Sequence, residues 1–163
     1  MPRRRLLSQR TGFTLCELIT VIAILSIVAA AGTVSLLHFK QKHQATGLAN
    51  LMKADINRAK ILAARYKSSV VLQIHEDHYE LFVDNGAGAA DPDDWLCEGR
   101  EPRVARREIL PALSLHSNFP GNHLRLRALG RVRPGTFTIQ SRSGEQIEVV
   151  VNAVGRIRLE YRG

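Results

Sequence analysis

The residues best suited to chemistry in this chain lie in a few short segments, and one of them is His75-Glu76-Asp77-His78. Imidazole and carboxylate groups ligate metals, but this segment lacks the histidine spacing that zinc peptidases place on a helix. It also separates two β-like runs, where a hairpin turn is expected. We therefore interpret it as a turn and expect no metal site there.

A second segment, residues 84–95, is an acidic loop rich in glycine and alanine. Its carboxylates are those of Asp84, Asp91, Asp93 and Asp94. They do not follow the Asp-x-Asp-x-Asp-Gly pattern of a calcium loop. The chain also has no nucleophile elbow, phosphate loop or paired catalytic constellation. We therefore expect no cofactor, and we expect that the protein is not an enzyme.

Two cysteines, Cys16 and Cys97, are too few for a disulfide scaffold or a cysteine-rich zinc site. Cys16 lies in an apolar stretch, where cysteine behaves as a small apolar residue. Cys97 lies far along the chain, so we do not expect the two to pair within one subunit. Cys97 is then either buried or joined to a partner.

Arginines form a fourth group, because residues 100–163 hold twelve arginines, no lysine and five glutamates, a balance of +7. The whole chain carries +8, so the charge is uneven and argues against a uniformly basic packing protein. Strand alternation places Leu124 and Leu126 on one face and Arg125 and Arg127 on the other. In the last strand it places three residues inward and four outward: Ile157, Leu159 and Tyr161 in, Arg156, Arg158, Glu160 and Arg162 out.

Two interpretations of these arginines stay open. A planar guanidinium binds phosphate in a bidentate manner, so an exposed arginine surface is a candidate nucleic-acid footprint. The alternative is a solvated sheet face with ion pairs to Glu145, Glu148 and Glu160.

The element that must position the N-terminal residues is an apolar helix. Residues 18–37 contain no charge, and twenty helical residues span roughly 30 Å, the thickness of a bilayer core. This predicts a transmembrane helix. A cleaved secretory signal has a shorter apolar core. A twin-arginine export signal could use Arg3-Arg4-Arg5, but basic residues before a membrane helix are commoner. A plain signal anchor leaves Glu17 unexplained, because a carboxylate beside an apolar span is costly.

The sequence around that glutamate, Gly12-Phe13-Thr14-Leu15-Cys16-Glu17, resembles the processing site of type IV prepilins and pseudopilins. The resemblance implies that a prepilin peptidase cleaves after Gly12 and that the new amine of Phe13 is methylated. It also implies a role for Glu17 in filament assembly, where its carboxylate neutralises the Phe13 amine of a neighbouring subunit inside the apolar core. An unpaired charge there would be costly, so such a pair would set the register.

The helix continues past the apolar stretch. Seven residues at spacings of three and four form an apolar stripe to about Tyr66: Ala45, Leu48, Leu51, Met52, Ile56, Ala59 and Leu62. Beyond Tyr66 the pattern becomes β, and we expect strands over residues 70–74, 79–83, 103–109, 112–116, 123–128, 135–141, 146–152 and 155–161. The predicted fold class is α+β: a long N-terminal helix, transmembrane in its first half, packed on a mostly antiparallel β head.

The C-terminal pattern sharpens the resemblance. A Gly-Thr-Phe-Thr-Ile strand at 135–139, then Ile-Glu-Val-Val-Val at 147–151, then Gly155-Arg156-Ile157-Arg158 resembles the GspH/FimT family of minor pilins and pseudopilins. In the FimT branch a Gly-Arg-x-Arg element is linked to binding DNA during uptake. The candidate DNA-binding residues are therefore Gly155, Arg156, Arg158, Arg125, Arg127, Arg131 and Arg133.

These expectations give four segments: a cleaved basic leader (1–12), a transmembrane half-helix (13–39), an amphipathic half-helix (40–66) and a periplasmic head (67–163). The leader arginines favour a cytoplasmic N-terminus in a single-pass protein of the inner membrane, from which the chain is extracted into a periplasmic or surface filament. The expected partners are the prepilin peptidase, other major and minor pilins or pseudopilins, the inner-membrane assembly platform, and DNA.

The expected function is that of a minor pilin or pseudopilin in a type II secretion or type IV pilus filament, supporting protein secretion or pilus assembly, with DNA binding by the C-terminal hairpin. One alternative is a FimT-type DNA receptor for natural transformation. A second is a plain signal-anchored periplasmic binding module.

Overall fold

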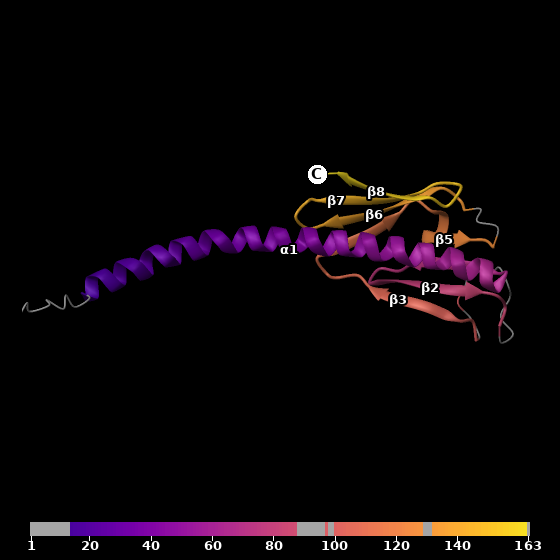
Figure 1. Ribbon diagram of the computed structural model, residues 1–163, viewed down its shortest axis with the longest axis horizontal. Helices are drawn as coiled ribbons and strands as arrows, with labels where there is room; N and C mark the ends of the chain where they lie inside the picture. Colours follow the sequence, from indigo (N-terminus) through magenta and orange to yellow (C-terminus); the bar gives the residue numbers. More distant parts are fainter. Residues whose placement is uncertain (1–13, 88–96, 98–99, 129–131, 163) are drawn as a thin grey trace, which may run out of the picture. The chain divides into compact units, whose positions relative to one another are not determined.

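The computed structural model describes residues 14–87, 97, 100–128 and 132–162, with only the backbone at residues 31–37. The chain divides into two compact units, Met1–Leu37 and His38–Gly163, each described separately below. The described elements follow in the order α1 (Leu15–Tyr66), β1 (Ser69–Ile74), β2 (His78–Asp84), β3 (Arg103–Glu108), β4 (Leu113–Ser117), η1 (Pro120–Asn122), β5 (His123–Leu126), β6 (Gly135–Ser141), β7 (Gln146–Val151) and β8 (Ile157–Arg162) (Figure 1).

The first unit contributes the start of α1. The backbone N–H of Glu17 donates to the Thr14 hydroxyl at 3.2 Å, so Thr14 caps the helix and the acidic Glu17 lies in its first turn. Side chains at residues 15–30 are exposed. We expected residues 13–39 to cross a membrane, but within the described part of the chain no helix has the length and apolarity that crossing needs.

The second unit holds two four-stranded antiparallel sheets. Sheet A has the order β3-β2-β1-β5, and sheet B has the order β4-β6-β7-β8. The β1–β2 hairpin pairs Val70 with Val83 and Ile74 with Tyr79. The helix and all eight predicted strands are confirmed, with boundaries that differ by one or two residues.

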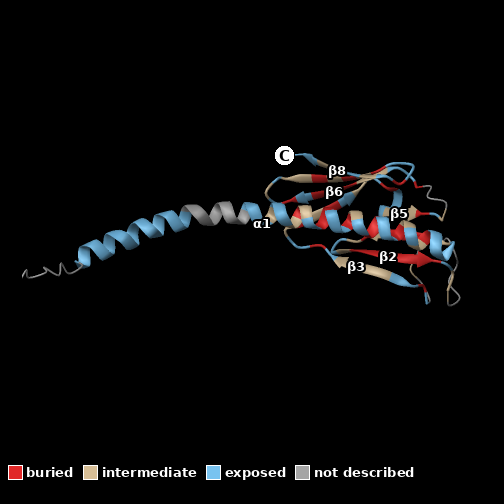
Figure 2. Ribbon diagram, in the orientation of Figure 1, coloured by how far each residue is buried: buried red, intermediate tan, exposed pale blue. Residues whose placement is uncertain are grey.

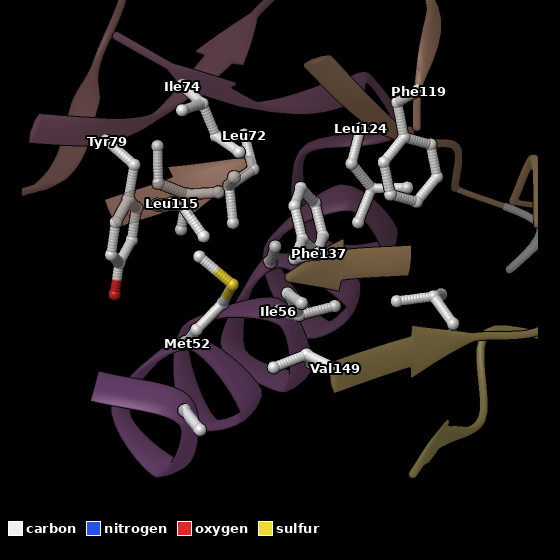
Figure 3. Packing of buried hydrophobic residues seen from close by; sticks show 14 of the residues in the cluster. Met52, Ile56, Leu72, Ile74, Tyr79, Leu115, Phe119, Leu124, Phe137 and Val149 are labelled. Atoms are coloured by element: carbon white, nitrogen blue, oxygen red, sulfur yellow. The ribbon is translucent and has the colours of Figure 1, made fainter. Parts of the chain in front are cut away.

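One core joins α1 to both sheets. From Ala45 to Ala63 the helix buries a residue every three or four positions, which gives the alternation of buried and exposed turns in Figure 2. Met52 and Ile56 pack among residues of sheet A, such as Leu72, and of sheet B, such as Phe137 (Figure 3). The prediction that Leu51 belongs to this buried stripe is wrong, because Leu51 is 37% exposed.

A buried polar cluster fixes α1 to sheet A. Asp55 is 4% exposed, and its Oδ2 accepts a hydrogen bond from the Tyr79 hydroxyl at 2.9 Å and from Arg107 Nε at 3.2 Å. Burial, followed by the negative charge of Asp55, raises the pKa of Tyr79. The hydrogen bond to Asp55 also raises the pKa of Arg107, so the carboxylate holds a neutral donor and a cation together.

Candidate functional site

The N-terminal candidates fall partly outside the described chain. Gly12 and Phe13, the predicted cleavage and methylation positions, lie outside the described residues, as does the leader. Glu17 is described, and it lies in the first turn of α1 on an exposed part of the helix. The cap from Thr14 is made through the Glu17 backbone, which leaves the side chain available.

Backbone contacts bring three of the predicted arginines, Arg127, Arg133 and Arg156, to one junction of the head. Val132 forms a β-bridge with Leu126 at the end of β5, and its N–H donates to the carbonyl of Ala153 in the β7–β8 turn at 3.3 Å. This contact places the backbone of Arg127, at the end of β5, and of Arg133 beside that turn. Both side chains are exposed, so the junction presents cationic groups to solvent.

The β7–β8 turn has a backbone that requires glycine. Gly155 has φ of 74°, and its N–H donates to the carbonyl of Asn152 at 2.8 Å. The Asn152 side-chain oxygen accepts the N–H groups of Val154 and Arg156 at 3.1 and 2.7 Å. This turn holds Arg156 at the start of β8 with its side chain exposed. The glycine of the Gly-Arg-x-Arg element therefore has a structural role in the hairpin.

Beyond the turn, the arginines of β8 are paired with glutamates. Arg158 forms an ion pair with Glu160, and Arg162 Nε lies 3.2 Å from Glu148 Oε1. The ion-pair interpretation is thus confirmed for Glu148 and Glu160, while Glu145 lies 3.2 Å from Lys42 of α1. The charges of Arg158 and Arg162 are therefore balanced by nearby carboxylates. Arg156, the other arginine of the Gly-Arg-x-Arg element, has no ion pair within the described residues.

The remaining candidates lie elsewhere. Arg125 is half-buried on the outer face of sheet A, where its Nε donates to the Ser69 hydroxyl at 3.0 Å. Burial, followed by the charge of Arg127, lowers the pKa of Arg125. Arg131 lies outside the described residues. Tyr161 lies on the inner face of β8 as predicted, opposite the buried Ile147, but it is 60% exposed because no described strand pairs with the other edge of β8.

The histidine segment is confirmed as a hairpin turn, closed by the His75 N–H donating to the His78 carbonyl at 2.8 Å. The two rings stack with centroids 4.4 Å apart. His78 Nδ1 lies 2.5 Å from Asp77 Oδ1, and this hydrogen bond lowers the pKa of Asp77. In the described residues no group of three or more histidine, cysteine or acidic side chains is arranged to hold a metal.

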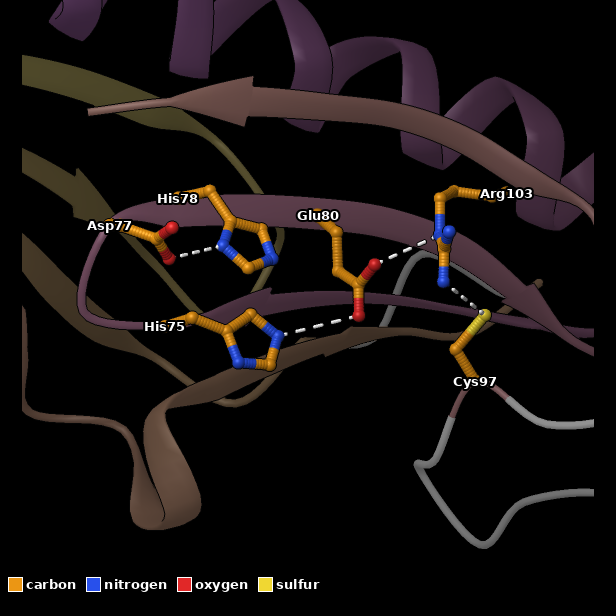
Figure 4. A network of polar contacts seen from close by, with 6 residues as sticks. All are labelled: His75, Asp77, His78, Glu80, Cys97 and Arg103. Carbon is orange, nitrogen blue, oxygen red and sulfur yellow. Dashed lines mark hydrogen bonds and ion pairs between the residues drawn. The ribbon is translucent and has the colours of Figure 1, made fainter. Parts of the chain in front are cut away.

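A chain of polar contacts continues from this turn along the outer face of sheet A (Figure 4). His75 Nε2 lies 3.3 Å from Glu80 Oε1, and Arg103 Nε lies 2.9 Å from the other oxygen of Glu80. Arg103 also approaches Cys97 Sγ at 3.8 Å. Cys97 is half-buried, and this burial raises the pKa of its thiol, an effect that Arg103 partly offsets.

One feature of the sequence points to the Asp55 cluster. Asp55 is the only acidic residue in α1 beyond Glu17, and it lies on the same helix face as Met52, Ile56 and Ala59. An acid on a buried stripe needs a partner. The partners, Tyr79 and Arg107, come from strands far along the chain, so their identity emerges only from the fold.

Comparison with known proteins finds a family match for the N-terminal region and solved structures with a similar fold. Residues 7–33 match the family model of the prokaryotic N-terminal methylation motif. No curated protein sequence matches the chain significantly.

Three solved structures share the fold. The minor pseudopilin EpsH from the Type 2 Secretion System of Vibrio cholerae is 17% identical with a TM-score of 0.57, over 74% of this chain and 98% of that chain. The type IV minor pilin FimU of Pseudomonas aeruginosa gives 16% and 0.53, over 71% and 91%. GspH of E. coli gives 15% and 0.56, over 73% and 89%. The chain therefore carries a prokaryotic N-terminal methylation motif and has the α+β fold of these minor pilin and pseudopilin structures.

Proposed function

We propose that this protein is a minor pilin or pseudopilin, a subunit of a type IV pilus or type II secretion filament rather than an enzyme. The observation that carries the proposal is the coexistence of two features in one chain. The methylation motif occupies residues 7–33, and the head that follows has the fold of EpsH, FimU and GspH. Each feature alone is compatible with other proteins, but filament subunits need both.

The N-terminal segment supplies the assembly chemistry in this proposal. A prepilin peptidase cleaves after Gly12, the Phe13 amine is methylated, and the apolar helix holds the subunit in the inner membrane until the assembly platform extracts it. Glu17 then pairs with the Phe13 amine of a neighbour. The supporting observations are the motif match across these residues and the position of Glu17 one turn into α1.

Filament co-fractionation tests this role. In cells that assemble the filament, the full chain should appear with sheared filaments, and Glu17→Ala should remove it from that fraction. Thr14→Ala, which takes away only the capping hydroxyl, is the matched control and should still co-fractionate. A Glu17→Ala chain that enters filaments normally would contradict the pairing role. A wild-type chain absent from filaments would favour a plain anchored binding module.

The finer assignment concerns what the filament moves. A GspH-type subunit serves protein secretion, whereas a FimT-type subunit receives DNA for natural transformation. Deleting the protein and measuring both secretion and transformation separates these roles, because each assay reports one of them.

A second candidate function, DNA binding, has a specific observation in its favour. The Val132–Ala153 contact draws the backbones of Arg127 and Arg133 to the turn that carries Arg156, and all three side chains are exposed. Exposed guanidinium groups free of carboxylates gain most from phosphate contacts. This proposal limits the main DNA-binding candidates to Arg127, Arg133 and Arg156. Arg158 contributes less in this proposal, because it is paired with Glu160.

Salt-dependent DNA binding by the detergent-solubilised full chain tests the junction. Arg133→Ala with Arg156→Ala should weaken binding and reduce the salt slope by about one per lost phosphate contact. Arg158→Ala with Arg162→Ala is the control with equal charge loss, and it should change the slope less. Equal effects of the two pairs would indicate a diffuse charge effect instead of a site. No binding at low salt would remove the function.

A further inference from the structure

The edge strands of the head differ in how they are protected. Exposed strand edges invite pairing with another chain, and proteins usually block them with charged side chains. The edges of sheet A are β3 and β5, and those of sheet B are β4 and β8. β3 and β8 each carry several charges, and β5 carries Arg125. Only β4, with the sequence Leu-Ser-Leu-His-Ser, has no aspartate, glutamate, lysine or arginine.

The hydrogen-bond register shows which backbone groups of β4 face its free edge. β4 pairs with β6 in antiparallel register, and the N–H groups of Asn118 and Arg142 donate to the carbonyls of Thr136 and Ala112. Because bonded pairs alternate along an antiparallel ladder, Ser114 and His116 bond to β6. Leu115 and Ser117 therefore direct their N–H and C=O groups away from β6, where no described strand pairs with them.

A notch of about 610 Å³ lies along this edge, lined by residues 74–78 of the β1–β2 turn, residues 113–116 of β4 and Asn122. Its apolar part comes from Ile74, Leu113 and Leu115, each nearly buried. The notch lies where β5 stops: β5 pairs with β1 only as far as Gln73, so Ile74 is paired with no described strand on that side. In the described part of the chain, no strand pairs with β4 at this place.

We propose that the edge of β4 accepts an extended strand from another subunit of the filament, an inference that rests on the proposed function. Outward N–H and C=O groups that repeat every second residue, about 7 Å apart, match an extended backbone and no compact ligand. Alternate side chains of the strand would be apolar where they face Ile74 and Leu115. The other side chains would face His116 and the exposed Arg142, so the partner strand carries acidic residues there.

Photo-cross-linking in cells that make the filament tests the proposal. A benzophenone amino acid replaces Ser114 in the full chain, and the cross-linked segment is identified by mass spectrometry of sheared filaments. We expect an adduct to a segment of another subunit with alternating apolar and acidic residues. The same probe at Gln140, one strand further from the edge, should not reach that segment.

Edge-blocking variants then decide the mode of binding. Ser117→Pro deletes an outward N–H without touching the β6 ladder and should lower the adduct yield about fivefold. Ser117→Ala loses the same hydroxyl, which donates to Asn122, but keeps the N–H and should leave the yield unchanged. Where Ser117→Pro fails to fold, His116→Glu tests the same edge by repelling the acidic strand, with Gln140→Glu as its control.

Three results would overturn the proposal. One is a chain that co-fractionates with filaments but gives no adduct from Ser114. Another is an adduct that survives both Ser117→Pro and His116→Glu. The third is a chain absent from the filament fraction, which overturns the proposed function itself and is distinguished by that absence.

Discussion

The two sheets of the head differ in how far their outer faces are buried. In β1 and β2, the two central strands of sheet A, both faces are buried: Leu72 and Leu81 belong to the core, and Val71 and Phe82, which point the other way, are also fully buried. In sheet B buried and half-exposed residues alternate along β7, so its outer face meets solvent. The difference indicates that the outer face of β1 and β2 is part of the packed interior, whereas the outer face of β7 is accessible to solvent.

The largest expected difference in the free energy of unfolding is between substitutions on the outer faces of the two sheets. Phe82→Ala should lower the free energy of unfolding by about 3–5 kcal/mol, because it empties a fully buried site. Val150→Ala, on the half-exposed outer face of sheet B, should cost less than about 1.5 kcal/mol. Urea unfolding of the full chain in detergent, followed by circular dichroism, measures both. Equal costs would contradict the division between the sheets.

Sequence patterns predicted this architecture well, because helix and strand periodicities are local. The change from spacings of three and four to alternation after Tyr66 located α1 and every strand of the described chain. The patterns did not predict that β1 and β2 are covered on both faces, since that depends on which segments meet in space. Tyr161 shows the same limit: its position in the alternation was right, but only the strand order reveals that β8 is an edge.

The candidate site was predicted in part for the same reason. The exposure of Arg127, Arg133 and Arg156 follows from alternation and turn signals. Their common junction depends on one long-range contact, from Val132 to Ala153, which no local pattern encodes. The glutamates near Arg158 and Arg162 were visible in the sequence, and the register of β7 against β8 decides which of them pair.

The attachment of α1 to each sheet gives the next contrast. Asp55→Ala should cost about 3 kcal/mol, because it leaves Tyr79 and Arg107 without their shared buried acceptor. Glu145→Ala breaks the exposed pair with Lys42 near sheet B and should cost less than about 1 kcal/mol. The same urea unfolding experiment compares them, and a costlier Glu145→Ala would reverse the account.

A smaller contrast concerns the outer ion pairs. Glu80 on sheet A is nearly buried, so Arg103→Ala should destabilise the head by about 1–2 kcal/mol. On sheet B, Arg162→Ala leaves Glu148 with the hydrogen bond from Gln146 and should cost less than about 1 kcal/mol. High salt should reduce the second cost more than the first, and thermal unfolding at two ionic strengths checks both statements.

The smallest effect is on thiol reactivity beside sheet A. Burial raises the pKa of Cys97, so at any pH below it a smaller fraction is thiolate than for an ordinary cysteine. Alkylation in a Cys16→Ser background should therefore be slow at pH 8 and accelerate as the pH rises. Arg103→Ala removes a cation that lowers this pKa and should slow the reaction further, while Arg106→Ala is the control. Faster alkylation of Arg103→Ala would contradict the assignment.

The central claim is that the methylation motif and the pilin-like head belong to one filament subunit, and intact-mass analysis of the chain recovered from sheared filaments tests it most directly. The account predicts a chain that begins at Phe13 and carries one added methyl group, with Met1 to Gly12 removed. A chain that retains its leader, or one that begins elsewhere and is missing from the filament fraction, would contradict it.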